Sequence, residues 1–337
     1  MAPIKPHGHV HEFSNGSTAI VCDPPPRGMR LDRATDEELV HYGLPPRPNP
    51  RAEPGLHALW QRTFARPLHF VVPEFGEPPE VWQSAFRPST ATVENTPDLS
   101  NWSGVAAGLQ DNIPVNKAVA ADWNVPEVGN DGLCSIWVGI DGYYSKDTNG
   151  NYYVTTPESP TNEMSPLLQA GITCFGQADP FYLAWWEWIA PGGAMNPPNP
   201  ITSLVPYAGY DYSTQIWVTS DRSATLCLFA GNNLTDYASG DFVSLPITAP
   251  PATTVWGSSA DWIVEVPQMQ DGTRYTLPIF EPVEFSSAMG WTASETTLYS
   301  GQGTALRATD PIGAHSVGQM VPLDRWDSTV VQCTYSA

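Results

Sequence analysis

Two polar side chains interrupt apolar, strand-like segments of this chain: Gln169 in Pro-Leu-Leu-Gln-Ala-Gly and Glu265 in Asp-Trp-Ile-Val-Glu. A carboxylate can activate water, and an amide N–H can stabilise the oxyanion that forms when water attacks a carbonyl. Residues 96–337 contain a single histidine, His315, and no HExxH, GxSxG or phosphate-binding glycine-rich motif. Hydrolytic chemistry in this part of the chain must therefore rest on carboxylates and amides. Taken singly, each residue also fits an ordinary strand position, the glutamine bonded to backbone and the glutamate facing solvent.

The elements that carry these residues are predicted to be short strands. The chain of 337 residues is 41% apolar and has 13 Trp and 13 Tyr, enough for a large core, while 35 Pro and 27 Gly indicate many turns. Short β-rich runs alternate with turn clusters at residues 118–125, 135–140, 182–189, 215–219, 225–229, 261–266 and 283–285. Many short strands at regular spacing favour an antiparallel sandwich or barrel.

The first 95 residues have a different pattern, which is helical. Thr35-Asp-Glu-Glu38 is a capping box, and Gly43 marks the end of the helix that it starts. Apolar residues between Pro54 and Ala65 recur at helical spacing and predict a second helix. We expect residues 1 to about 30, rich in Pro, Gly and His without periodicity, to be disordered or loosely attached. Residues 73–97 are Pro-rich and are predicted to form a linker.

Charge separates the same two parts. Residues 1–90 carry nine Lys/Arg and ten Asp/Glu, whereas the remainder carries six and twenty-five, out of a net charge of −20. The helical pieces are too small to bury a core alone, so we expect them to dock on the acidic domain through their arginines. So acidic a surface disfavours nucleic acid and anionic membranes, and its self-repulsion decreases in acid. No apolar stretch is long enough for a membrane span, or for a signal peptide within Met1–Gly28.

Six sequence motifs follow one another along the acidic part of the chain, between residues 101 and 265. They are Asn101-Trp-Ser-Gly104, Val119–Pro126, Trp137-Val-Gly-Ile-Asp-Gly142, Leu167-Leu-Gln-Ala-Gly171, Ala184-Trp-Trp-Glu-Trp188 and Ala260-Asp-Trp-Ile-Val-Glu265. This order resembles the glutamic peptidases, the acid endopeptidases also called eqolisins. Residues 35–46 and the arginine-bearing segment after them also resemble the pro-segment of that family.

The resemblance implies a fold, an activity and a site. The fold is all-β, a sandwich of two bent antiparallel sheets of the concanavalin or jelly-roll type over residues 96–337, with a small, partly helical pro-like segment over residues 1–95. A substrate cleft crosses one concave face, and Glu265 and Gln169 form the catalytic dyad. The positions that line or support the cleft are Trp102, Trp137, Asp141, Trp185 and Glu187. No metal or cofactor is implied.

The resemblance further implies polypeptide substrates and an extracellular, monomeric enzyme made as a zymogen. Its own N-terminal segment is then an intramolecular inhibitor, which docks while the carboxylates are charged and weakens in acid. Cleavage is expected between about residues 73 and 99. We expect no partnership with nucleic acid or membranes.

The sequence departs from the family pattern in two places near the site. Residues 143–166 are an insertion, in which Asn149-Gly150 favours a β-hairpin with tyrosines on both strands that could cover the cleft. The last motif has Ala260-Asp261 where the family has Ala-Glu, so Asp261 is an alternative catalytic acid. We prefer Glu265 because it keeps the family's residue.

The sequence also allows other functions. A non-catalytic β-sandwich could bind carbohydrate by stacking surface Trp and Tyr on sugar rings. An aspartic peptidase is less favoured, because Asp-Thr-Gly and Asp-Ser-Gly are both absent. A cysteine–histidine nucleophile would have to use His315, although no sequence flanking a cysteine favours it. Five cysteines are too few for a disulfide scaffold and leave room for one or two bridges.

Overall fold

The structure is a computed structural model. It describes residues 5–79, 101–108, 114–129, 131–146, 152–154, 165–191, 197–267, 275–292, 297–309, 314–320 and 329–336. Within these residues no helix combines the length and the apolar character that crossing a bilayer requires.

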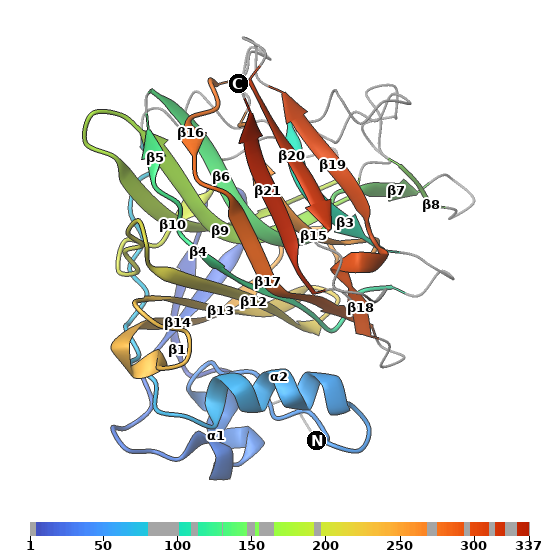
Figure 1. The fold of residues 1–337 in the computed structure, drawn as a ribbon. Helices are drawn as coiled ribbons and strands as arrows, with labels where there is room; N and C mark the ends of the chain where they lie inside the picture. Colours follow the sequence, from blue (N-terminus) through green and yellow to red (C-terminus); the bar gives the residue numbers. More distant parts are fainter. Residues whose placement is uncertain are drawn as a thin grey trace.

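Two antiparallel sheets, named the front sheet and the rear sheet, form the sandwich, and in Figure 1 β6 and β9 of the front sheet lie above β12, β13 and β14 of the rear sheet. The front sheet has the order β11 (Asn199–Pro200), β10 (Phe181–Ile189), β9 (Leu167–Gly176), β6 (Gly132–Asp141), β15 (Ala260–Glu265), β3 (Trp102–Ala107), β19 (Thr304–Thr309). The rear sheet has the order β1 (Gly8–Glu12), β2 (Thr18–Cys22), β14 (Gly240–Thr248), β13 (Ser223–Gly231), β12 (Asp211–Ser220), β4 (Ala118–Asn124), β17 (Val283–Trp291), β18 (Thr297–Tyr299). The sequence expectation of a sandwich or barrel is thus resolved in favour of the sandwich.

Two bent strands join the sheets at one side. The start of β17 pairs with β21 (Val331–Ser336), and the end of β19 pairs with β20 (His315–Met320), while β20 and β21 pair with each other. Smaller pairings are β5 (Val128–Gly129) with β16 (Ile279–Phe280) and β7 (Tyr144–Lys146) with β8 (Tyr152–Val154). Short 3-10 turns lie at Leu31–Arg33, Tyr237–Ser239 and Ser300–Gln302.

The main core lies between the two sheets, because alternate side chains of each strand point inward. The front sheet contributes Trp186, Trp188 and Trp262, and the rear sheet contributes Trp123 and Tyr212. All five are almost completely buried. The remaining side chains of the front strands therefore point to its outer face, which carries the site described below.

A second apolar cluster lies on the outer face of the rear sheet. Its sheet members include Trp217, Phe229 and Trp291, and they pack against Leu56 and Trp60 of α2 (Pro54–Phe64). In Figure 1, α2 and α1 (Asp36–His41) lie below β12, β13 and β14, away from β6, β9 and β15. The two helices and the outer face of the front sheet are therefore on opposite sides of the sandwich, whereas Phe75 forms a bridge to Ile201 just after β11.

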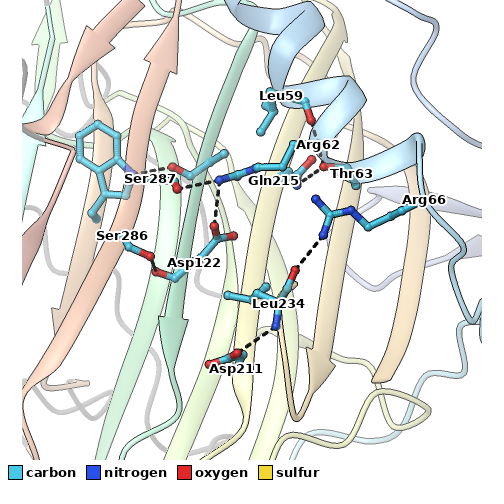
Figure 2. Close-up of polar contacts among 12 residues, drawn as sticks. Leu59, Arg62, Thr63, Arg66, Asp122, Asp211, Gln215, Leu234, Ser286 and Ser287 are labelled. Carbon is cyan, nitrogen blue, oxygen red and sulfur yellow. Dashed lines mark hydrogen bonds and ion pairs between the residues drawn. The ribbon is translucent and has the colours of Figure 1, made fainter. Parts of the chain in front are cut away.

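A half-buried ion pair, with a buried aspartate and an arginine that is 32% exposed, connects α2 to the rear sheet (Figure 2). Arg62 Nη1 lies 3.1 Å from Asp122 Oδ2 on β4 and donates a hydrogen bond to Ser287 Oγ. Gln215 Nε2 of β12 donates to Thr63 Oγ1. Burial raises the pKa of Asp122, although the charge of Arg62 opposes the rise. The predicted docking of an arginine-bearing segment on an acidic domain is borne out at this contact.

The start of the chain corrects one expectation. Residues 8–22 are not loosely attached, because β1 and β2 form a hairpin whose second strand pairs with the edge strand β14. Phe13 packs against Trp186 with ring centroids 5.0 Å apart, and the main chain at Ile247 pairs with Ala19. Pairing at a sheet edge depends on backbone hydrogen bonds. The side-chain pattern of residues 1–30, which has no periodicity, therefore did not predict it.

The predicted elements agree with the structure at most positions. Both helices are present, and Thr35 and Glu38 form the reciprocal capping box. All seven predicted strands fall on strands of the structure, although β6, β12 and β17 extend three to six residues beyond the predicted bounds. The hairpin in the insertion is present as β7 and β8, although its turn at residues 147–151 lies outside the described residues. The predicted linker also lies outside them beyond residue 79.

Candidate active site

Five neighbouring strands of the front sheet carry the predicted site residues on one face, and the first of them, β3, carries Trp102 opposite Glu265. In the order β15, β6, β9, β10, Glu265 is opposite Ser135, and Gln169 is opposite both Gly139 and Glu187. As the alternation predicts, Trp185 belongs to the outer cluster of this sheet, whereas Trp186 and Trp188 belong to the inner core. A single strand, β6, separates the strand of Glu265 from that of Gln169.

Glu265 is held by nitrogen donors that include Trp137 and Asn101. Trp137 Nε1 donates to its Oε2 and Asn101 Nδ2 to its Oε1, both at 2.9 Å. Only 3% of the residue is exposed. Burial raises the pKa of Glu265 to about 7, and the hydrogen bond from Trp137 opposes that rise. The carboxyl can therefore exchange a proton in the range where general acids and bases are useful.

Gln169 is held by the neighbouring carboxyl of Glu187. Its Nε2 donates to Glu187 Oε2 at 2.9 Å, and both side chains are 2% exposed. Among the described residues this leaves one amide hydrogen uncommitted, and Gln169 Oε1 is buried with no hydrogen-bond partner there. Burial raises the pKa of Glu187 to about 8, with a further contribution from the charge of Glu265. The two glutamates are thus close enough to interact electrostatically.

The indole of Trp137 links the two halves of this arrangement. Its Nε1 bonds to Glu265, while its six-membered ring lies over Gly139, the residue opposite Gln169. A Cβ at Gly139 would lie 2.8 Å from that ring, so the glycine makes room for it. Trp102 packs edge-on against Trp137, with centroids 4.9 Å apart. The aromatic residues therefore set the position of the carboxyl as well as enclosing it.

Asp141 has a supporting place beside the site. Its two carboxylate oxygens accept hydrogen bonds from the backbone N–H groups of Trp256 and Ser258, at 2.8 and 2.6 Å, just before β15 begins. Burial raises its pKa to about 6, against these hydrogen bonds. Asp141 has a positive φ of 72°, a conformation that aspartate tolerates better than most residues. Asp141 therefore holds the loop that precedes β15, the strand of Glu265.

Asp261, the alternative acid, lies on the same face of β15 as Glu265, four residues earlier. It is fully buried and accepts a hydrogen bond from Ser259 Oγ at 3.1 Å. Burial raises its pKa well above the usual range. Its environment has a single hydroxyl donor, in contrast to the nitrogen donors that hold Glu265.

The predicted site residues are buried in this structure. None of the seven predicted site residues is more than 3% exposed. Tyr143, Leu167, Phe175 and Leu306 are buried in the same cluster as Trp137 and pack against it. The physical reason is the apolar character of these residues, which favours contact over exposure to water. Glu265 must therefore become more exposed before a substrate can reach its carboxyl.

Two residues of the site, Asn101 and Gly139, were not predicted from the sequence. Asn101 immediately precedes the recognised Trp102, and its position in that motif was the available signal. Gly139 lies inside another motif, but only the tertiary structure reveals that an indole covers it. Among the described residues there is no group of three His, Cys, Asp or Glu side chains placed to hold a metal ion. His315 lies on β20, opposite Thr309 and Ser336.

Comparisons with known proteins agree with this architecture. Residues 100–312 match the model of the Peptidase A4 family. A scytalido-glutamic peptidase solved with a transition state analog inhibitor has a similar fold, with a TM-score of 0.51 and 20% identity over 70% of this chain and 98% of that chain. SCP-B, a member of the eqolisin family solved with the tripeptide Ala-Ile-His, gives 0.49 and 20% over the same shares. No curated protein matches the chain. The family match covers more than half of the sequence, and the chain therefore belongs to the Peptidase A4 family, the glutamic peptidases or eqolisins.

Proposed function

We propose that this peptidase is an acid endopeptidase in which Glu265 and Gln169 act as the catalytic pair. The observation that carries the proposal is the geometry of two buried groups on one sheet face. A carboxyl is held by Trp137 and Asn101, and an amide is held by Glu187 with a hydrogen and an oxygen left over.

Hydrolysis of a peptide bond needs an activated water, stabilisation of the carbonyl oxygen and a proton for the leaving nitrogen. As a carboxylate, Glu265 takes a proton from water as the water attacks the carbonyl carbon. As the acid, it then gives that proton to the departing amine. The uncommitted N–H of Gln169 donates to the oxyanion, and because an amide does not titrate, it can do so at any pH. No covalent intermediate forms.

Glu187 has a positioning role in this scheme. A protonated carboxyl keeps an acceptor oxygen, so the hydrogen bond from Gln169 persists after Glu187 takes up a proton. Its pKa of about 8 keeps it neutral in acid. A neutral partner orients the amide without adding a negative charge beside the developing oxyanion.

Activity in acid requires the site to open. With a pKa of about 7, the enclosed Glu265 is mostly protonated below neutrality and cannot act as a base. Water that enters with the substrate removes the desolvation that raises this pKa, and the value then falls toward the ordinary one of about 4.3. Opening thus supplies both the nucleophile and the ionised form of its base.

The test is a comparison of three variants on a denatured protein substrate. Glu265→Gln is expected to lower kcat/KM about a thousandfold. Asp261→Asn, the matched change on the same strand face, is expected to retain most activity. If the two results are reversed, Asp261 is the base and the assignment is wrong.

Gln169→Ala is expected to lower kcat by about a hundredfold or more without unfolding the protein, because one oxyanion donor contributes roughly 2.7–4 kcal/mol. Gln215→Ala removes an equally buried strand glutamine from the rear sheet and serves as the control for nonspecific damage. Nearly full activity in Gln169→Ala would exclude this amide from the mechanism.

We also propose that the chain is made as a zymogen with residues 1–95 as its pro-segment. The helix α2 of that segment packs on the outer face of the rear sheet, and Phe13 and Phe75 reach the β10–β11 edge of the front sheet, so inhibition by the described part acts by restraining the sandwich. Acid would loosen the contact between Arg62 and Asp122 as the aspartate takes up a proton. Purified chain in acid should shorten by cleavage between about residues 73 and 99, whereas Glu265→Gln should stay intact. A wild-type chain that neither shortens nor degrades protein would refute the proposal.

The carbohydrate-binding alternative has little support, because the described tryptophans that it would use are buried, including Trp102, Trp137 and Trp185. A glycan-binding screen tests it directly. An extracellular, monomeric form acting on polypeptides remains our proposal from the family resemblance. Secretion and sedimentation measurements test those two points.

A further inference from the structure

Two of the five cysteines face each other across neighbouring strands of the front sheet. Cys134 on β6 is directly opposite Cys174 on β9, and both side chains point into the main core with no exposed surface. The other three, Cys22, Cys227 and Cys333, have residues other than cysteine opposite them in every strand pairing of the described residues. All five are free thiols in this structure.

The geometry of this pair suits a covalent bond. Residues directly opposite in an antiparallel pair have Cα atoms about 4.5 or 5.5 Å apart, depending on the type of position. Disulfides join Cα atoms about 4.4–6.8 Å apart, so either type falls inside the range. The Cys134 thiol is also within hydrogen-bonding reach of the Cys174 thiol. No strand needs to shift register for the sulfurs to meet.

We propose that Cys134 and Cys174 are a disulfide site that closes when the chain folds in the presence of a small-molecule disulfide such as oxidised glutathione. One cysteine thiolate attacks the small disulfide, forming a mixed disulfide and releasing one reduced thiol. The second cysteine thiolate then attacks the protein sulfur of that mixed disulfide and releases the second thiol. Two electrons pass from the cysteines to the small disulfide, and the two protons lost by the cysteines go to the two leaving thiolates.

The bond must form before the core closes. Burial raises the pKa of the Cys174 thiol well above its usual value, and the thiolate is the nucleophile in exchange. Inside the folded sandwich both the thiolate and the oxidant are therefore excluded. Refolding from denaturant is the condition under which the two thiols are exposed and able to react.

The crosslink would join the two strands that carry Trp137 and Gln169. It closes a loop of about 40 residues that includes the insertion, and constraining such a loop stabilises the folded state mainly by restricting the unfolded chain. We expect the melting temperature of the oxidised protein to exceed that of the reduced protein by roughly 5–10 °C.

The experiment is peptide mapping of the full chain refolded with oxidised and reduced glutathione. The product is unfolded in the presence of an alkylating reagent, digested and analysed by mass spectrometry. We expect a linked pair of peptides containing Cys134 and Cys174, two hydrogens lighter than the reduced pair, with the other three cysteines alkylated. Alkylation of all five cysteines, or a link between any other pair, would overturn the proposal.

Variants provide a second, independent measurement. Cys134→Ala should abolish the difference in melting temperature between oxidised and reduced preparations. Cys227→Ala removes an equally buried cysteine of the rear sheet and should preserve that difference. Equal differences in both variants would contradict the assignment. Should Cys134→Ala fail to fold, the peptide map of the wild-type chain still decides the question.

Discussion

Replacing Glu187 by Gln tests the electrostatics of the site through stability. Burial and the nearby Glu265 raise the pKa of Glu187 from 4.5 to about 8. A carboxyl with a raised pKa supports the fold fully below the pKa of the unfolded chain, and this contribution is lost as the pH rises through the folded value. At about 1.36 kcal/mol per pKa unit, ionising Glu187 costs the folded state at most about 5 kcal/mol.

Glutamine keeps an acceptor for Gln169 Nε2 but cannot ionise. Near pH 4 the free energy of unfolding of Glu187→Gln should therefore stay within about 1 kcal/mol of wild type, as expected for a near-isosteric change. Near pH 9 the variant should be the more stable protein by up to about 5 kcal/mol. The acid activity of the variant should be largely preserved, because the amide of Gln169 stays oriented.

Urea unfolding at the two pH values measures this difference, and kcat/KM in acid is measured on the same preparations. Glu284→Gln, which changes an exposed glutamate on β17, is the matched control and should leave the pH dependence of stability as in wild type. The reasoning is refuted if Glu187→Gln and wild type lose stability in parallel as the pH rises. Loss of acid activity in a stable Glu187→Gln protein would instead show that the carboxyl takes part in the chemistry.

Two further changes test the surroundings of the site and the N-terminal contact. Gly139→Ala should push the Trp137 ring away and lower kcat by roughly tenfold or more. Tryptophan fluorescence would report the displacement of the indole. Unchanged kinetics would show that the position of the ring is unimportant. Arg62→Met should destabilise the chain by about 3 kcal/mol near neutral pH, and by less in acid, because it leaves Asp122 buried without its cation. Arg30→Ala removes an exposed ion pair and should cost under about 1 kcal/mol, and equal losses at both positions would contradict the burial argument.

The N-terminal segment covers part of the rear sheet, which bears on the proposal that it is a pro-segment. It covers Trp217 and Trp291 on the rear sheet, and its hairpin pairs with that sheet through β2 and β14. Its removal would expose an apolar face of the sandwich. Removal of an inhibitor that only fills an active site would not expose such an apolar face. Under the proposed cleavage, the protein without this segment should therefore differ from the intact chain in solubility as well as in activity.

Local patterns were sufficient for several conclusions about the chain. The capping box at Thr35 and the apolar spacing after Pro54 predicted both helices, because these signals act within a few residues. The alternation around Trp185 and Glu187 assigned those residues to one sheet face, since strand geometry has a period of two. The order of motifs identified the family and selected Gln169 and Glu265.

Other features depend on residues far apart in the sequence. The hairpin of residues 8–22 finds its partner at β14, more than two hundred positions later, and no local signal marks an edge strand. The burial of the site residues also arises from packing among strands from across the chain.

Side-chain type and backbone period are local properties, so the residue pattern alone indicates which side chains could do chemistry and which face of a strand each occupies. Only the tertiary structure decided which of these residues touch. It bonded Glu187 to Gln169, laid Trp137 over Gly139 and set Cys134 against Cys174. Strand register is the physical reason, since it depends on the packing of both sheets together and on no single segment.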